Sequence, residues 1–221
     1  MRSLILDLET AGLPNAKDWL DDEPITAPST YKDPQKIAEY IAKAEAEREK
    51  RIALDIDCNR IVALGFVDAA GGDPTVYLMR DEFEEREQLK LFWERYRRAD
   101  TRLVTFNGFK FDLPTLMRRS MYLDVPAPVL NVDRYRSEHL DIWQRLSFNG
   151  AIPAHSLKFY AKRLGIGTLD KVSGADIGRL VAENTAESWQ AIHDHVLSDV
   201  GLTHAIALRL GLLPKLAERA A

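Results

Sequence analysis

The order of apolar segments along the chain constrains its fold more than any other feature. Short runs rich in β-branched and apolar residues come first, and amphipathic runs with helical periodicity dominate later, as in a layered α/β protein. The strand-like runs are residues 2–8, 60–67, 75–79 and 103–106, and the helix-like runs are 82–99, a segment from about 112, 141–147, 155–164, 174–183 and 186–210. The turn Gly71-Gly72-Asp73-Pro74 joins the second and third strands directly, so we expect the first three strands to form an antiparallel meander.

Residues 12–57 do not fit this layout, because the segment is far longer than an ordinary turn. It begins Pro- and Asp-rich and turns helical from Asp33, a favourable N-cap that precedes Pro34 at the first helical position. We therefore predict a single domain over residues 1–221 with an insertion at about 12–57. Because the insertion leaves the first strand right after Glu9, we expect it to form a mobile flap beside that residue.

Composition excludes several classes of protein. With 46% apolar and 29% charged residues, the chain is an ordinary globular one rather than a disordered or collagen-like one. The net charge of −4 argues against a globally basic nucleic-acid binder, although residues 101–171 carry 11 Lys and Arg against 6 Asp and Glu. Cys58 is the sole cysteine, so we expect neither a disulfide nor a Cys-rich zinc site. Without an apolar run long enough for a membrane span or a signal peptide, a cytoplasmic protein is expected.

Two carboxylates end the first strand-like run. Asp7 and Glu9 are two residues apart, so on a strand both side chains point to the same face. Carboxylates held side by side are costly to desolvate unless a cation lies between them, and Mg²⁺ or Mn²⁺ suits such oxygens. The alternative is that the strand ends in solvent, where two neighbouring carboxylates carry little desolvation penalty.

A second motif follows the fourth strand-like run, at Asn107-Gly108-Phe109-Lys110-Phe111-Asp112. Taken alone, Asp112 is equally well explained as the N-cap of the next helix. Phe109 and Phe111, however, bracket Lys110 in a polar turn, and aromatic rings beside a cation are typical of a surface on which nucleic-acid bases stack.

The last motif lies in the C-terminal helix-like run, where His195 and Asp199 are four residues apart and therefore one turn from each other. The pair is explained either as an ordinary surface pair or as a metal site. Aromatic residues of the 82–99 run have the spacing of core anchors: Phe83, Phe92, Trp93 and Tyr96, together with Leu89.

Taken in order, these motifs resemble the DEDD superfamily of 3′–5′ exonucleases, whose members have a ribonuclease H-like fold. The form of residues 107–112 is similar to the proofreading domain of family B DNA polymerases, and closer still to the stand-alone predicted exonucleases related to it. Further matching stretches are Tyr135–Asp141, Ser156–Lys158, Leu164–Ile166 and Val172–Asp176. The resemblance covers residues 1–10 and about 60–212, and each motif is weak alone but specific in this order.

The resemblance implies a role for each matching position. Asp7, Glu9, Asp112 and Asp199 would hold two divalent metal ions, Mg²⁺ or Mn²⁺, that activate water and stabilise the leaving 3′ oxygen. The residues that would contact the terminal nucleotide or the strand are Thr10, Asn107, Gly108, Lys110, Phe111 and Lys158. Asp141 would be structural or lie just behind the ligands.

The sequence departs from the family pattern at one place. Polymerase-type members carry a tyrosine four residues before the last aspartate, and members that use histidine carry it five before. Here His195 lies four before Asp199, so the chain has the tyrosine spacing with a histidine in it. We interpret His195 as the residue that orients the attacking water or acts as the general base, since its ordinary pKa is about 6.5.

The resulting prediction is a metal-dependent 3′–5′ exonuclease acting on single-stranded 3′ ends, with DNA favoured over RNA and a replication or repair protein as a possible partner. An RNA exonuclease of the same fold is the first alternative. The second is a catalytically inactive module that binds nucleic acid.

Overall fold

The computed structural model describes residues 1–19, 24–133, 135–167 and 170–214. The strands are β1 (Arg2–Gly12), β2 (Asn59–Asp68), β3 (Thr75–Leu78), β4 (Thr101–Thr105) and β5 (Leu140–Asp141). The helices are α1 (Pro34–Leu54), α2 (Glu82–Arg97), α3 (Asp112–Tyr122), α4 (Ile142–Leu146), α5 (Leu157–Arg163), α6 (Ile177–Glu183) and α7 (Ala186–Arg209), with the 3-10 turns η1 (Ala16–Asp18) and η2 (Gly174–Asp176).

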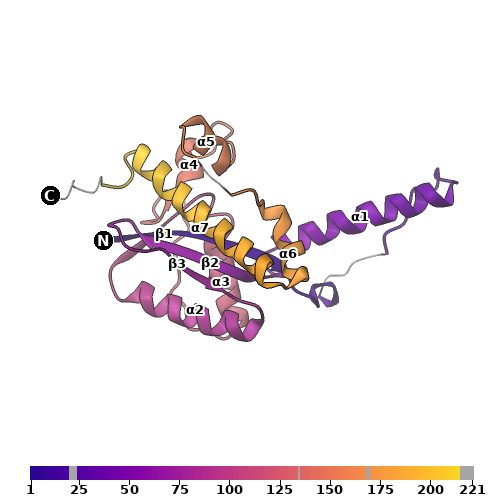
Figure 1. Cartoon of the computed structure of the whole chain (residues 1–221), viewed down its shortest axis with the longest axis horizontal. Helices are drawn as coiled ribbons and strands as arrows, with labels where there is room; N and C mark the ends of the chain where they lie inside the picture. The colour runs from indigo at the N-terminus through magenta and orange to yellow at the C-terminus, as the bar shows by residue number, and fades with distance from the viewer. Residues whose placement is uncertain (20–23, 134, 168–169, 215–221) are drawn as a thin grey trace.

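Within the described part of the chain, the strands form one five-stranded sheet in the order β3-β2-β1-β4-β5 (Figure 1). β1 and β3 both pair antiparallel with β2, whereas β4 pairs parallel with β1 and β5 parallel with β4. The antiparallel meander expected for the first three strands is confirmed, and the sheet is mixed. The register between β1 and β2 shifts between Glu9 and Thr10, directly after the second of the two carboxylates that β1 carries.

The alternation of side chains along β1 decides which groups face which helices. One face of the sheet is covered by an apolar cluster from β1, α2 and α3: Leu4, Leu6, Leu8, Leu89, Phe92, Trp93, Leu113 and Leu116. Ile5 points to the other face and belongs to a cluster with Val200 of α7. Asp7 and Glu9 continue the Ile5 side of the strand, because successive side chains of a strand alternate between faces. Both acids therefore point toward α7.

α7 lies close against the sheet, which it crosses in Figure 1. Gly65 of β2 allows this approach, because a Cβ added there would lie 3.0 Å from the Cγ2 atoms of both Val196 and Val200. Interiors packed this tightly leave no room for a further methyl group. The close contact fixes the height of His195 and Asp199 above β1.

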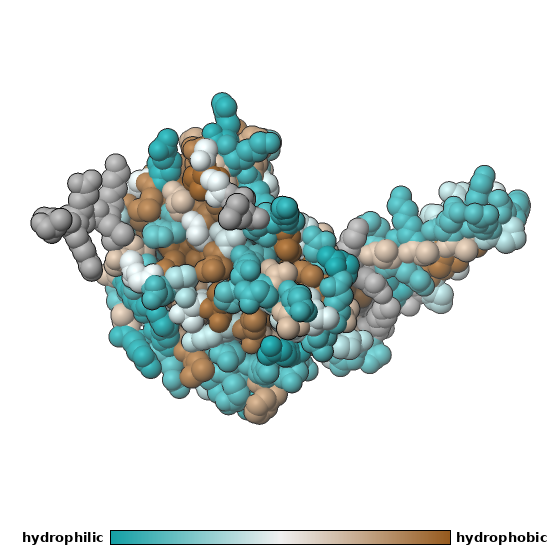
Figure 2. Space-filling view, in the orientation of Figure 1, coloured by the Kyte–Doolittle hydropathy of each residue, from teal (hydrophilic) through white to brown (hydrophobic). Residues whose placement is uncertain are grey.

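The insertion between β1 and β2 carries α1, which projects from one end of the body as an arm (Figure 1). The helix begins as expected, with the Asp33 carboxylate accepting a hydrogen bond of 2.9 Å from the Gln35 amide. Figure 2 shows hydrophilic residues over most of the visible surface of the arm, with a narrow row of apolar ones. Residues 20–23 of the insertion lie outside the described residues.

The base of the arm is fixed to the strand that carries the acids. The Thr10 hydroxyl donates to the Ala53 carbonyl at 2.8 Å, and the Asn59 side-chain amide donates to the same oxygen at 3.1 Å. Beside them, a small apolar cluster joins the ends of the insertion: Leu13, Ala16, Ile52 and Cys58. One end of α1 is thereby held next to Glu9.

The helix expected at about 141–147 is α4 at Ile142–Leu146, with the short strand β5 just before it. Two details of the sequence prediction were wrong. β1 runs on to Gly12, so Asp7 and Glu9 lie within the strand, and the insertion does not leave it right after Glu9. Phe83 is not a core anchor, because it is 74% exposed, whereas Phe92 and Trp93 are fully buried. No helix among the described residues is both long and apolar enough to cross a membrane.

Candidate active site

Four carboxyl groups from three elements meet beside the second half of β1. Asp7 and Glu9 lie on β1, Asp112 begins α3 and Asp199 lies on α7. Burial, and then the charges of Asp112, Glu9 and Asp199, raise the pKa of Asp7 well above its ordinary value. Burial, with added repulsion from Asp141 and Glu9, raises the pKa of Asp112 to about 8. Burial is also the main cause that raises the pKa of Asp199 to about 6.

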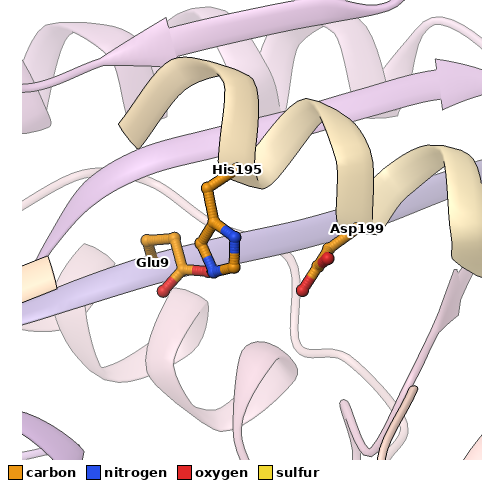
Figure 3. A group of neighbouring side chains, drawn as sticks. All are labelled: Glu9, His195 and Asp199. Atoms are coloured by element: carbon orange, nitrogen blue, oxygen red, sulfur yellow. The ribbon is translucent and has the colours of Figure 1, made fainter. Parts of the chain in front are cut away.

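The oxygens of this cluster are suited to bind cations. Oδ2 of Asp7 and Oδ1 of Asp199 are buried and have no hydrogen-bond partner among the described residues. Glu9, His195 and Asp199 each offer a ligand atom, and these atoms lie within 4.8 Å of one another (Figure 3). Buried carboxylates without donors are costly unless a cation neutralises them, and an oxygen-rich donor set suits Mg²⁺ or Mn²⁺. The residues present therefore fit divalent cations.

His195 lies between two carboxylates and is almost fully buried, with 2% of its side chain exposed. Its Nε2 is 3.0 Å from Oε1 of Glu9, and its Nδ1 is 2.7 Å from Oδ2 of Asp170. Burial acts to lower its pKa, but the hydrogen bond and charge of Glu9, with the hydrogen bond to Asp170, outweigh burial and raise the pKa to about 9. In the metal-free protein the ring therefore favours its protonated form at neutral pH, unlike a histidine with the ordinary pKa.

These shifts predict how the stability of the metal-free protein depends on pH. A group whose pKa is higher in the folded than in the unfolded state stabilises the fold at low pH and loses this effect as pH rises through the folded value. Asp199 loses its stabilising effect as the pH rises through about 6, and Asp112 as it rises through about 8. His195 loses its effect as the pH rises through about 9. We expect the melting temperature in chelator to fall by roughly 5 °C or more between about pH 5 and pH 8.

Differential scanning fluorimetry in matched buffers measures this dependence. Saturating Mn²⁺ should stabilise the protein more at pH 8 than at pH 5, because the cation binds the ionised carboxylates. A melting temperature in chelator that stays constant or rises over this interval would contradict the charge repulsion described for the cluster.

The turn that carries Asn107 and leads into Asp112 is held by Asp141. The backbone amides of Asn107 and Phe109 donate to the two oxygens of the Asp141 carboxylate at 2.8 and 3.2 Å. Asn107 itself has φ of 67°, a left-handed conformation that asparagine tolerates better than most residues. Asp112 is the first residue of α3 rather than its N-cap, which is Phe111. Asp141 therefore positions the turn, in line with the structural role expected for it.

Gly108 is required by the packing of this turn. A Cβ added there would lie 2.1 Å from Oγ1 of Thr105 and 2.5 Å from its Cβ, closer than any real contact. We expect Gly108→Ala to lower the free energy of unfolding by about 2 kcal/mol, because the turn or β4 must shift. Urea denaturation measures the effect. Gly178→Ala is the matched control, since a Cβ there meets nothing within 4 Å; equal stability of the two variants would contradict this reading.

The remaining residues predicted to contact substrate lie around the carboxylates, and in this structure their side chains contact other residues of the protein. The Thr10 hydroxyl is bonded to Ala53, and Phe111 packs against the apolar cluster under α2 and α3. The Lys110 ammonium lies over the ring of Trp143, 4.4 Å from its centre. The Lys158 ammonium is 2.8 Å from Oδ2 of Asp170. Their roles as substrate contacts stay predictions.

Asp170 is the member of the site that sequence reasoning missed. Its side chain is 6% exposed, and a single oxygen, Oδ2, meets both His195 and Lys158. An isolated acid in a basic stretch of the sequence was the signal available, and it does not by itself indicate a partner. The contact depends on how the segment after α5 passes over α7.

Most of the chain matches a known protein family. Residues 54–219 match a family described as predicted 3′–5′ exonucleases related to the exonuclease domain of PolB. The chain belongs to this family. The match includes Asp112, His195 and Asp199, while β1 with Asp7 and Glu9 precedes it and is brought to the same site by the sheet. No curated protein matches the sequence.

Among solved structures, the chain is similar to the family B DNA polymerase from the hyperthermophilic archaeon Pyrobaculum calidifontis. The TM-score is 0.63 at 18% sequence identity, and the match covers 95% of this chain. It covers 24% of the polymerase, so this chain spans about a quarter of that protein. At this identity the likeness shows the fold, and the ribonuclease H-like fold expected from the sequence is confirmed.

Proposed function

We propose that the protein is a 3′–5′ exonuclease that hydrolyses phosphodiester bonds at single-stranded DNA 3′ ends with two divalent ions, Mg²⁺ or Mn²⁺. One observation carries the proposal: four carboxyl groups lie together in a chain that belongs to this family. Two of the groups have a buried oxygen that accepts no hydrogen bond from the described residues. A module that only binds nucleic acid has no need for such a costly cluster. An inactive module is therefore the weaker explanation.

Asp7, Glu9, Asp112 and Asp199 would hold the ions. The chemistry that divalent ions supply in such sites is a lowered pKa of the attacking water and neutralisation of charge on the leaving oxygen. The four carboxylates would balance the positive charge of two ions and hold them beside the second half of β1. His195 presents Nε2 at this cluster, where it would orient the water. One water is consumed, the bond from phosphorus to the 3′ oxygen breaks, and a 5′-mononucleotide and a shortened strand result.

The terminal nucleotide would be held beside the cluster by the turn after β4. Asn107 would offer its side-chain amide, Gly108 lets the turn pack closely against Thr105, and Phe111 would lie near the terminal base. Lys110 and Lys158 supply positive charge for backbone phosphates, and Thr10 fixes the adjacent end of the arm. We favour DNA as the substrate because the Asn107-to-Asp112 motif is of the polymerase-exonuclease type. The alternative is a 3′–5′ exonuclease that acts on RNA. A replication or repair protein would be the partner of the enzyme.

The arm would guide the strand that leads into this site. A groove of about 720 Å³ runs along α1 and is lined by both aromatic and charged residues: Tyr31, Lys36, Glu39, Tyr40, Lys43, Ala44, Glu47 and Arg51. Aromatic rings and cations together suit a single strand. Replacing Lys36 and Lys43 by glutamate should weaken cleavage of long strands more than of trinucleotides; equal effects at every length would dispose of this role.

A gel time course on 5′-labelled single-stranded DNA and RNA of one sequence tests the proposed function. We expect a ladder that shortens from the 3′ end with Mg²⁺ or Mn²⁺, faster on DNA, and no products in chelator. A faster ladder on RNA would transfer the proposal to the RNA alternative. Intact strands of both kinds under all metal conditions, with binding retained, would support the inactive module instead.

A further inference from the structure

We propose that Asp170 is a positioning residue that fixes the ring of His195 so that Nε2, and not Nδ1, faces the carboxylate cluster. The inference rests on the proposed function, because it assigns Asp170 a part in the same reaction. It extends that function, since no motif of the sequence singles out Asp170 and its contact with His195 is seen in the fold alone.

The contact has the geometry of a strong, charge-assisted hydrogen bond. The distance from Nδ1 of His195 to Oδ2 of Asp170 is 2.7 Å, and both side chains are buried, with 2% and 6% exposed. An ionised carboxylate accepts hydrogen bonds and donates none, so Nδ1 carries the hydrogen. The other ring nitrogen, Nε2, is then the one that can exchange a proton at the cluster, where it lies 3.0 Å from Glu9.

Asp170 is itself held in place. Its Oδ1 accepts a hydrogen bond of 2.9 Å from the Val172 amide, and its Oδ2 is 2.8 Å from the Lys158 ammonium. Lys158 also donates to the Val172 carbonyl, which ties the ammonium to the same short segment. Burial acts to raise the pKa of Asp170, but the hydrogen bonds from Lys158 and His195 outweigh it and lower the pKa, which keeps the carboxylate ionised.

The orientation of the His195 ring depends on a carboxylate such as that of Asp170. The ring can rotate about its last side-chain bond and exchange the positions of a nitrogen and a carbon, and a fixed acceptor on Nδ1 opposes this rotation. Carboxylates behind functional histidines play this part in other sites. Loss of the partner behind a metal-binding histidine typically costs roughly 10–100-fold in metal affinity or activity. We expect a loss of roughly this size in kcat with KM unchanged, because Asp170 acts through His195 and does not touch the strand.

The kinetic test uses the full chain with Mn²⁺ over a range of strand concentrations, so that kcat and KM are measured separately. Asp170→Ala and the near-isosteric Asp170→Asn should lower the rate, and Asp170→Glu should restore part of it. Asp194→Ala is the matched control, since this carboxylate on the same helix contacts Gln190 and His193 instead. In a His195→Ala background, Asp170→Ala should cost nothing further. A rate equal to that of the parent, or an undiminished loss in that background, would overturn the proposal.

A second background separates the two partners of Asp170. If its effect disappears in Lys158→Ala but persists in His195→Ala, then Asp170 positions the lysine and the proposal is wrong. The expected result is the opposite pattern, with the effect retained when Lys158 is replaced.

Proton NMR of the metal-free protein tests the hydrogen bond without any activity. The parent should show a strongly deshielded ring N–H proton from His195 that is lost in Asp170→Ala and kept in Asp194→Ala. A parent that shows this proton but cleaves nothing would refute the proposed function and leave the contact standing. A parent that cleaves but lacks the proton would refute the role of Asp170 and leave the nuclease standing.

Discussion

Replacing Asp7 by asparagine should reduce cleavage by roughly 10³-fold or more and, at the same time, raise the melting temperature of the metal-free protein. Activity falls because the amide cannot replace an ionised ligand of the cation cluster. Stability rises because burial and the charges of Asp112, Glu9 and Asp199 disfavour an ionised carboxylate at this place, and the neutral amide avoids that cost. Opposite effects on stability and activity are typical of functional sites that lower the stability of the fold.

Single-turnover cleavage and scanning fluorimetry in chelator measure the two effects on one preparation. Asp124→Asn is the matched control, because Asp124 is fully exposed and has φ of 53°, a conformation that asparagine also accepts. The control should match the parent in both assays. An Asp7→Asn protein that cleaves at the parental rate would remove Asp7 from the ligands, and one that melts lower in chelator would contradict the charge repulsion.

His195→Ala should lower the single-turnover rate by roughly 10²–10³-fold, the range typical of a lost acid–base group. The rate of the parent should rise with pH as the ring loses its proton. With cations bound, this limb should lie below the pKa of about 9 of the metal-free protein, because the cations cancel the Glu9 charge that raises it. The variant should lack the limb, because no ring remains to titrate.

The neighbouring His193 provides the control for this prediction. Its ring contacts Asp194 on the outer side of α7, with 35% of the side chain exposed. His193→Ala should therefore keep both the rate and the pH profile of the parent. If His195→Ala behaved in the same way, His195 would have no part in the reaction.

Local patterns were sufficient to predict the parts of the site that lie on regular elements. The apolar run Leu4 to Leu8 marks a strand, so the period of two places Asp7 and Glu9 on one face, where the structure has them. The four-residue spacing of His195 and Asp199 puts both on one side of α7, and the helical periodicity around them is unambiguous. The meander and the capped start of α1 followed from turn and cap residues for the same reason.

What the sequence did not reveal depends on contacts between distant segments. Asp170 contacts His195 although the two residues are 25 positions apart in the sequence. The contact arises because Asp170 lies against α7, and no periodic pattern in the sequence indicates this. The raised pKa of His195 follows from Glu9, which is remote in sequence. β5 has two residues and pairs with β4 alone among the described strands, so no local propensity distinguishes it from the start of α4.

The two-cation site can be tested by diffraction from crystals grown with Mn²⁺ and measured at the manganese absorption edge. We expect two anomalous peaks about 3.5–4 Å apart, the spacing of two-metal sites. Their ligands should be oxygens of Asp7, Glu9, Asp112 and Asp199, with His195 outside the coordination shells and still bonded to Asp170. A single peak with His195 as a ligand, or no peak beside Asp7 and Glu9 at saturating Mn²⁺, would contradict the two-metal proposal.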